Sequence, residues 1–323
     1  MSQAPIQSTP PAEPGPAGPI GPSQRVRLYR WLRLSRSVDL KQRDLTSAGE
    51  ALFHMPTAGH EGIAALGLFL TDDDWTHVHY RSKALLVARG LDVPQYFHSL
   101  LSNADDDNLG RMMGCFHADP GKHIAPMVVP TGNHALHAVG VAQQLVEDAK
   151  RQGRENHAIV ICGVGDGTTQ QGEVLEAIAE AVRQKLPVLF YVEDNGFAIS
   201  TQTRRNTFFD LPGGPADRFY GLPIHRFDGV DVWPELQGIG QVVRDVRDSQ
   251  SPGLMVLRCE RLTNHTNADD QRIYRTAEEL DAAKETRDPV AIFRGKLIAQ
   301  GDLEEADVAK LDAEIDEDVR VAA

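Results

Sequence analysis

The sequence predicts an α/β fold in which a parallel sheet carries helices on both faces. Apart from His157 and Glu193 at their ends, residues 157–163 and 186–193 are apolar, which is typical of strands buried on both sides. Between them, residues 170–185 follow a helical period with one apolar stripe, at Val174, Leu175, Ile178, Ala181 and Val182. Buried strands that alternate with amphipathic helices indicate a parallel sheet covered on both sides.

The other elements are expected in the following order. Helices are predicted over residues 25–48, 60–70 and 95–101, followed by a loop-rich stretch over 103–133 and a helix over 134–151. After the second apolar strand, the pattern predicts a helix around 232–247, a strand over 253–262 and an acidic helical tail over 276–323. We therefore expect one domain over residues 24–275, with residues 276–323 as a helical extension of the same domain.

The first 23 residues differ from the rest in composition. Residues 1–22 are rich in proline and glycine and contain one charged side chain, Glu13. Such a segment buries too little apolar surface to offset the entropy lost on ordering. We expect residues 1–23 to form a disordered leader.

The overall composition excludes several classes of protein. The formal net charge of −13 argues against nucleic acid as a partner, because a phosphate-backbone binder needs a basic face. No apolar run approaches the roughly 20 residues that a membrane helix needs. Three cysteines, Cys115, Cys162 and Cys259, are odd in number and far apart, which favours buried thiols in a reducing compartment. A cytoplasmic protein without membrane contact is expected.

A glycine-rich turn follows the first apolar strand. Residues 163–169 read GVGDGTT, so the glycine spacing is G-x-G-x-G rather than the G-x-G-x-x-G of dinucleotide-binding loops. The carboxylate of Asp166 would repel a bare pyrophosphate unless a divalent cation lay between the two anions. A nicotinamide-dependent dehydrogenase built on this loop remains an alternative at this point.

A second group of metal ligands is expected after the next strand. Residues 186–193 lead directly into Asp194, Asn195, Gly196 and Phe197. Because the carboxyl ends of adjacent parallel strands lie side by side, Asn195 should approach Asp166. Magnesium prefers about six oxygen ligands and takes several from phosphate and water. A carboxylate, an amide oxygen and a backbone carbonyl would leave room for two phosphate oxygens.

These residues resemble the thiamine diphosphate motif, in which Gly-Asp-Gly is followed by paired asparagines. Here residues 165–167 are followed, after 26 residues, by Asp194 and Asn195, so the second asparagine is kept and the first is replaced. The resemblance implies a thiamine diphosphate-binding fold. It implies cofactor contacts from Gly165, Asp166, Gly167, Asn195 and Phe197, and Mg²⁺ ligands at Asp166, Asn195 and the carbonyl of Phe197.

Two further segments are similar to the alpha subunits of pyruvate, branched-chain 2-oxo acid and acetoin dehydrogenases. Residues 59–62 (GHEG) and 79–81 (HYR) match one pattern, which implies that Tyr80 and Arg81 bind the cofactor diphosphate. Residues 261–275 (RLTNHTNADDQRIYR) are similar to the family's active-site loop. This implies that Arg261 helps to hold phosphate and that His265 reaches the cofactor and assists acyl transfer.

The resemblance implies an alpha subunit that acts in the oxidative decarboxylation of a 2-oxo acid, either branched-chain or pyruvate. Thiamine diphosphate and Mg²⁺ would be the cofactors, and the acyl group would pass to a lipoyl-bearing acyltransferase. Only 48 residues follow Arg275, too few for a second α/β domain. The glutamate that activates the cofactor is therefore expected on a beta subunit, in an assembly of two alpha and two beta chains. An acetoin dehydrogenase and a scaffolding subunit without activity are the alternatives.

Overall fold

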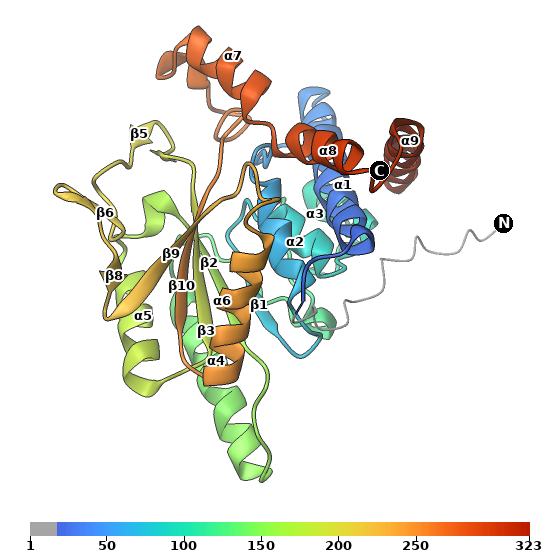
Figure 1. Ribbon diagram of the computed structural model, residues 1–323. Coiled ribbons are helices and arrows are strands. Elements are labelled where there is room, and N and C mark those ends of the chain that lie inside the picture. The colour runs from blue at the N-terminus through green and yellow to red at the C-terminus, as the bar shows by residue number, and fades with distance from the viewer. Residues whose placement is uncertain (1–17) are drawn as a thin grey trace.

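The computed structural model describes residues 18–323, so most of the expected leader lies outside the described residues. Within that range, a six-stranded sheet has the order β1-β2-β3-β10-β9-β8 (Figure 1). All neighbours are parallel except β8 and β9. The strands are β1 (Trp75–His77), β2 (Val160–Gly165), β3 (Val188–Asp194), β8 (Arg218–Phe219), β9 (Leu222–Asp228) and β10 (Gly253–Arg258). The expected α/β fold with a mainly parallel sheet is confirmed.

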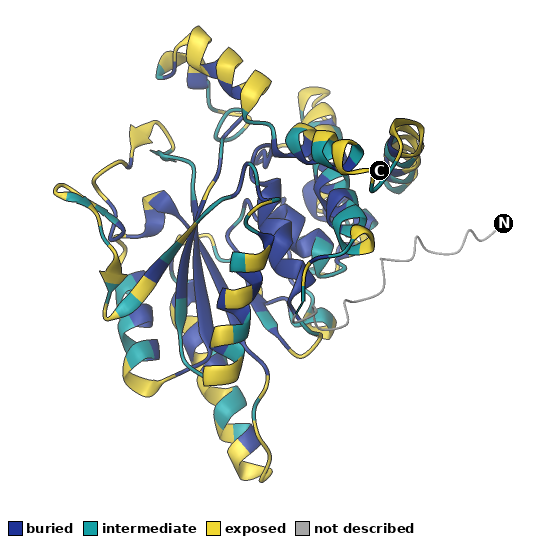
Figure 2. Cartoon of the chain, in the orientation of Figure 1, coloured by how far each residue is buried: buried dark blue, intermediate teal, exposed yellow. Residues whose placement is uncertain are grey.

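Helices cover both faces of this sheet. On one face, α4 (His134–Arg151) and α5 (Gly172–Gln184) share a hydrophobic core with Val160 and Cys162 of β2. On the other face, α6 (Leu236–Ser249) shares a core with Ile161 of the same strand. Successive residues of a strand point to opposite faces, which is why the strand sequence is apolar without alternation. Figure 2 shows the central strands buried and the outer sides of the helices exposed.

The N-terminal and C-terminal segments pack together beside the sheet. Helix α1 (Pro22–Ser47) contacts α8 (Pro289–Gln300) and α9 (Glu305–Ala322). Arg25 of α1 forms an ion pair with Asp302, with 2.5 Å between Nε and Oδ2. Helix α7 (Ala277–Thr286) projects from the body near the top of Figure 1. The expected helical tail is thus confirmed as three helices, two of which pack on α1.

Several elements differ from the sequence-based expectation. The segment expected as a helix over 60–70 is a 3₁₀ helix, η1 (Glu61–Leu68), not an α-helix. Strands β1 and β9 and helix α2 (Lys83–Ala88) were not predicted. Strand β1 is three residues long and β9 contains Pro223 and polar residues, so neither has the apolar run that revealed β2 and β3. Strand β2 extends to Gly165, so the turn that follows it begins two residues later than expected. Strand β10 ends at Arg258 rather than at residue 262.

The smaller elements complete the chain. Helix α3 spans Val93–Leu101, and short 3₁₀ turns are η2 (Pro120–Lys122), η3 (Asp166–Thr168) and η4 (Gln271–Ile273). Two two-stranded pairs follow β3: β4 (Phe197–Ala198) with β5 (Thr201–Gln202), and β6 (Asp210–Leu211) with β7 (Gly214–Pro215). The three cysteines are free and buried, as expected. Within residues 18–323, no helix is both long and apolar enough to cross a bilayer.

Candidate active site

The carboxyl ends of β2 and β3 meet at one cavity of about 350 Å³. Gly165 of β2 lies opposite Glu193 of β3 in the parallel register, so the residues that follow each strand emerge side by side. The expected convergence of Asp166 and Asn195 is therefore present. The cavity is lined by His79, Tyr80, Arg81, Gly165, Asp166, Gly167, Thr168, Asn195, Phe197, Ala198, Ile199, His265 and Thr266, and also by Phe53, Met55, Met113, Phe116, Val129 and Thr131.

The two glycines of the turn are required by close neighbours. A Cβ atom on Gly167 would lie 2.6 Å from the Cβ of Ala198, and one on Gly165 would lie 2.9 Å from Nε2 of His79. Neither glycine has a positive φ, so the constraint is space rather than backbone conformation. The turn can therefore approach β4 and His79 only without side chains.

Asp166 is a buried carboxylate without a basic partner. Only 3% of the residue is exposed, and its Oδ2 accepts a hydrogen bond from the Thr203 hydroxyl at 2.5 Å. Among the described residues, it forms no ion pair with lysine, arginine or histidine. Burial, together with the nearby charge of Asp194, raises the pKa of Asp166 above its ordinary value. A divalent cation at the carboxylate would offset both effects, so the residue fits a metal ligand.

The amide of Asn195 is held by two contacts. Its Oδ1 accepts a hydrogen bond from the backbone N–H of Phe197 at 3.1 Å, and its Nδ2 lies 3.2 Å from Nε2 of His60. Asp194 does not line this cavity: it lines a second cavity together with Arg258 and accepts from the Gly196 N–H, although its charge is near enough to act on Asp166. The replacement of the family's first asparagine by Asp194 therefore lies outside the main cavity.

Arg81 and His265 are joined at the cavity wall. Arg81 is 1% exposed, and one guanidinium nitrogen lies 2.6 Å from Nδ1 and 2.8 Å from the carbonyl oxygen of His265. The other terminal nitrogen donates to the carbonyl of Pro56. The guanidinium carbon of Arg81 lies 5.2 Å from the centre of the Tyr80 ring, and this ring meets the His265 ring edge-on. Segments far apart in the sequence are thereby fixed against each other.

The state of His265 follows from these contacts. Burial, followed by the positive charges of Arg81 and Arg261, lowers the pKa of His265 to about 4. The imidazole is therefore neutral near pH 7. Because a guanidinium can only donate, Nδ1 is the acceptor and the ring proton resides on Nε2.

Arg261 does not line this cavity. It is 1% exposed, and its terminal nitrogens donate to the carbonyl of Ile199 and the hydroxyl of Tyr274, both at 2.7 Å. Its guanidinium also lies over the ring of Phe197, at 5.4 Å. This placement does not favour the expected phosphate contact. Instead, Arg261 supports two residues that do line the cavity, Phe197 and Ile199.

His79 lines the cavity but was not predicted as a site residue. It is 5% exposed, and neither ring nitrogen has a hydrogen-bond partner among the described residues. Its Nδ1 lies 3.7 Å from Oε1 of Glu193, beyond hydrogen-bonding distance. Buried polar atoms without partners are uncommon in proteins, and His79 lines a cavity that would receive a polar ligand. The sequence signal that could have revealed His79 was its position next to Tyr80 in the HYR segment. The apolar lining residues Phe53, Met55 and Val129 belonged to no motif that could have revealed them.

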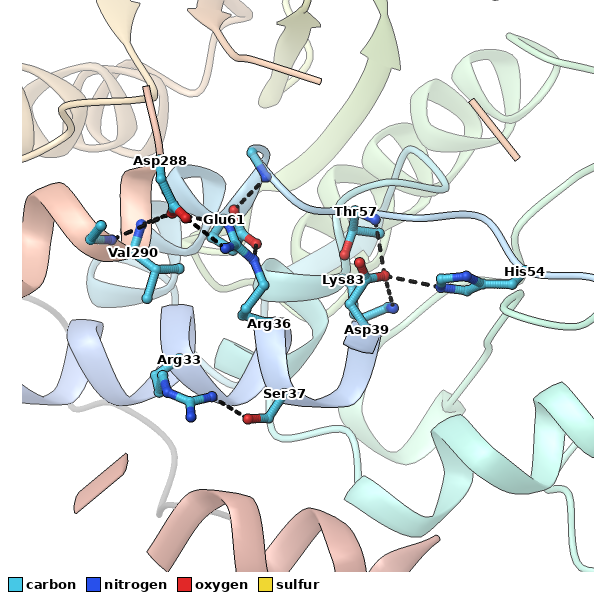
Figure 3. A network of polar contacts seen from close by, with 12 residues as sticks. Arg33, Arg36, Ser37, Asp39, His54, Thr57, Glu61, Lys83, Asp288 and Val290 are labelled. Atoms are coloured by element: carbon cyan, nitrogen blue, oxygen red, sulfur yellow. Dashed lines mark hydrogen bonds and ion pairs between the residues drawn. The ribbon is translucent and has the colours of Figure 1, made fainter. Parts of the chain in front are cut away.

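A buried network on α1 holds the loop that forms one wall of the cavity (Figure 3). Asp39 of α1 accepts hydrogen bonds from Nζ of Lys83 at 2.7 Å and from the backbone N–H of Thr57 at 2.9 Å. Its Oδ1 also lies 3.2 Å from Nε2 of His54. Lys83 thus points away from the cavity toward α1.

A second group of contacts from α1, also drawn in Figure 3, engages Glu61. One of its oxygens accepts from Nε of Arg36 at 2.6 Å and the other from the N–H of Gly59 at 2.8 Å. Arg36 also pairs with Asp288, which caps the N-terminus of α8. Glu61 is 1% exposed and does not line the cavity. Both carboxylate oxygens are therefore used to anchor the turn at residues 59–62.

Comparison with known proteins shows the family of this chain. Residues 29–323 match the family described as dehydrogenase E1 component. The chain belongs to that family. It is 32% identical over 288 residues to the 3-methyl-2-oxobutanoate dehydrogenase subunit alpha of Mycobacterium tuberculosis, which covers 87% of this chain and 72% of that protein.

Two other relatives show the breadth of the family. The pyruvate dehydrogenase E1 component subunit alpha of Mycoplasma genitalium is 28% identical, over 94% of this chain and 82% of that protein. The mitochondrial 2-oxoisovalerate dehydrogenase subunit alpha of Caenorhabditis elegans is 27% identical, over 85% of this chain and 63% of that protein. The expected resemblance and enzyme class, an alpha subunit of a thiamine diphosphate-dependent 2-oxo acid dehydrogenase, are confirmed.

Proposed function

We propose that this E1 alpha subunit binds the metal-diphosphate half of the cofactor and takes part in oxidative decarboxylation of a 2-oxo acid. The observation that carries the proposal is the meeting of Asp166 and Asn195, at adjacent strand ends, in a cavity that also contains the Arg81–His265 pair. A nicotinamide-binding loop would not place a buried carboxylate at the phosphate position. A scaffolding subunit would have no need to retain it.

The residues fit a magnesium ion and a diphosphate. Asp166, the Asn195 side chain and the Phe197 carbonyl would supply metal ligands, because Mg²⁺ prefers oxygen and takes the remaining positions from phosphate and water. Arg81 and Tyr80 would contact the diphosphate, and His79 offers a buried nitrogen without a partner. When bound, thiamine diphosphate supplies the nucleophilic carbon and the electron sink that decarboxylation needs.

His265 is proposed as the catalytic residue of this chain. Its Nε2–H can donate a hydrogen bond in the cavity, while Nδ1 is fixed by Arg81. A donor with a fixed tautomer would help to orient the acyl group during its transfer to the lipoyl arm of an acyltransferase. Because its pKa lies far below 7, His265 is neutral near pH 7 and carries its one ring proton on Nε2.

The second half of the site is proposed to come from a beta subunit. As an alpha subunit, the chain implies a beta partner, and we propose two copies of each. Exposed apolar side chains surround the cavity mouth: Val129 is 62% exposed, Ile199 55% and Met113 37%. Exposed apolar groups of this kind mark interaction surfaces. The cytoplasmic location stays a prediction.

The substrate is proposed to be a 2-oxo acid with an apolar side chain. One wall of the cavity is apolar and consists of Phe53, Met55, Met113 and Phe116. An apolar wall favours a branched-chain acid over pyruvate. Acetoin is the second candidate. Turnover of branched-chain 2-oxo acids, pyruvate and acetoin by the alpha–beta complex, measured with lipoamide as acceptor, separates these candidates.

The metal site is tested by binding. Asp166→Asn should weaken Mg²⁺-dependent binding of thiamine diphosphate to the alpha–beta complex by about 1–3 kcal/mol, the range for a charged hydrogen-bonding group. Titration calorimetry with and without a chelator measures this loss. Asp210→Asn, outside the cavity, is the control. Unchanged binding in Asp166→Asn would contradict the proposed metal site.

A further inference from the structure

The amide of Asn195 lies at the end of a buried hydrogen-bonded chain that begins at Glu193. Oε2 of Glu193 lies 2.6 Å from Nδ1 of His60, and Nε2 of His60 lies 3.2 Å from Nδ2 of Asn195. Glu193 is not exposed at all and His60 is 1% exposed. The Ser82 hydroxyl donates to the other oxygen of Glu193. This series of hydrogen bonds therefore runs through the protein interior to the proposed metal ligand.

The direction of each hydrogen bond in this chain is determined by chemistry. A carboxylate accepts, so Nδ1 of His60 carries the proton and Nε2 has the free lone pair. That lone pair can accept only from the N–H₂ side of the Asn195 amide. The opposite side of the amide, Oδ1, accepts from the Phe197 N–H. A reversed amide would place two acceptors together at His60 and two donors together at Phe197.

We infer that Glu193 and His60 act as positioning residues that fix the orientation of the Asn195 amide, so that its oxygen rather than its nitrogen is available to the metal. This inference rests on the proposed function, because it assumes that Asn195 is a metal ligand. Buried partners of metal ligands commonly orient them, and their loss typically costs 10–100-fold in metal affinity. Neither residue lines the cavity, so neither acts on the substrate directly.

The same atoms invite a competing interpretation as a separate metal site. Ligand atoms of His60, Glu193 and Cys259 lie within 4.8 Å of one another. However, the direct contact between His60 and Glu193 already occupies the nitrogen and oxygen that a metal would need. The other ring nitrogen of His60 faces Asn195. The contacts thus favour orientation of the amide over binding of an ion within this group.

The orienting role predicts different results for two substitutions of His60. His60→Leu keeps an apolar group of similar size but removes both hydrogen bonds. It should weaken Mg²⁺-dependent binding of thiamine diphosphate by about ten-fold or more. His60→Gln can donate to Glu193 with its N–H₂ and accept from Asn195 with its oxygen, so it should retain most of the affinity. His117→Leu, an equally buried histidine outside the cavity lining, is the matched control.

A second substitution, Asn195→Asp, makes the test specific for the amide. A carboxylate presents oxygen to the metal in either orientation, so it needs no partner to orient it. In the Asn195→Asp background, His60→Leu should therefore lower the affinity for the cofactor by less than about two-fold, which is the usual error of additivity. Binding would be measured by calorimetry on the alpha–beta complex, with Mg²⁺ and then Mn²⁺, after circular dichroism and melting have established folding.

The outcomes separate the inference from the proposed function. Full affinity in His60→Leu, or an equal loss in folded His60→Leu and His60→Gln, would overturn the orienting role. So would an undiminished effect of His60→Leu in the Asn195→Asp background. If His60→Leu does not assemble, the affinity of His60→Gln decides, and a ten-fold loss there counts against the role. Cofactor binding by the unaltered complex that needs no divalent metal would instead overturn the proposed function.

Discussion

Arg81 donates a hydrogen bond to Nδ1 of His265 across 2.6 Å, although 184 residues separate them in the sequence. The same guanidinium nitrogen also donates to the backbone carbonyl of His265. The contact fixes the ring, selects its Nε2–H tautomer and connects the proposed diphosphate-binding segment to the active-site loop. It also places a permanent positive charge beside the imidazole.

The first prediction concerns the catalytic role of His265. His265→Ala should fold, bind cofactor and lose about 100-fold or more in acyl transfer to lipoamide, the scale of an acid–base group. Decarboxylation followed with an artificial electron acceptor should fall less, because that assay omits the transfer step. Exposed His157 provides the control through His157→Ala. Equal activity of His265→Ala and the unaltered complex in both assays would disprove the assignment.

The second prediction concerns the charge state of His265. Its pKa of about 4 in the folded chain lies below the ordinary 6.5, so the unfolded chain binds more protons between these values. Its contribution to the free energy of unfolding therefore falls as the pH drops from 6.5 toward 4. Arg81→Met removes the nearest positive charge and should raise the pKa of His265. NMR titration of labelled histidine would measure the shift, and an unchanged or lower value would count against this electrostatic account.

The third prediction tests the close approach of Gly167 to Ala198. Gly167→Ala would bring two Cβ atoms to 2.6 Å and should displace the turn that carries Asp166. We expect weaker cofactor binding and a loss of stability of about 1–3 kcal/mol, as for other overpacked sites. Ala198→Gly removes the opposing atom, so the double variant should recover most of the cofactor affinity. Failure of the double variant to recover would mean that Gly167 is required for another reason.

The fourth prediction concerns the buried pair of Lys83 and Asp39. Lys83→Met leaves the Asp39 carboxylate buried without its cation and should destabilise the chain by about 3–5 kcal/mol. The double variant Asp39→Asn with Lys83→Met, in which both groups are neutral, should lose less stability than Lys83→Met alone. Lys83 and His54 hold the pKa of Asp39 far below its ordinary 3.8, so the stabilisation is present above that pH and is lost as the pH falls below it.

Thermal melting at pH 7 and near pH 3 would check this account. Lys310→Met, which removes an exposed lysine, is the control and should melt like the unaltered chain. A Lys83→Met melting temperature equal to that control would show that the pair contributes nothing to stability.

The last prediction is that the chain is inactive by itself. Both oxygens of Glu61 are engaged by Arg36 and Gly59, so it is not placed to activate the cofactor. Purified alone, with saturating thiamine diphosphate and Mg²⁺, the chain should decarboxylate no 2-oxo acid above background. Addition of its beta subunit should restore activity and saturate near one to one. Strong turnover by the isolated chain, abolished by Glu61→Gln, would reverse this assignment.

The sequence alone predicted the parallel sheet and the two strand ends that form the proposed metal site. Strands β2 and β3 are apolar on both faces, so their pattern is local, and the place of Asp166 and Asn195 follows from the rule for adjacent parallel strands. Tyr80, Arg81 and His265 were found because their neighbours along the chain form motifs. Strands β1 and β9 were missed because their pairing depends on partners distant in sequence rather than on their own composition.

Only the tertiary structure decided what each side chain contacts. It placed Arg261 behind Phe197 and Ile199 instead of in the cavity, turned Lys83 toward Asp39, and used both oxygens of Glu61 in the turn at residues 59–62. It also joined Glu193, His60 and Asn195, which come from two segments more than 130 residues apart. Motifs encode which residues lie near one another along the chain. The direction of a buried side chain depends on the hydrogen-bond partners that distant segments bring to it, and these exist only in the folded protein.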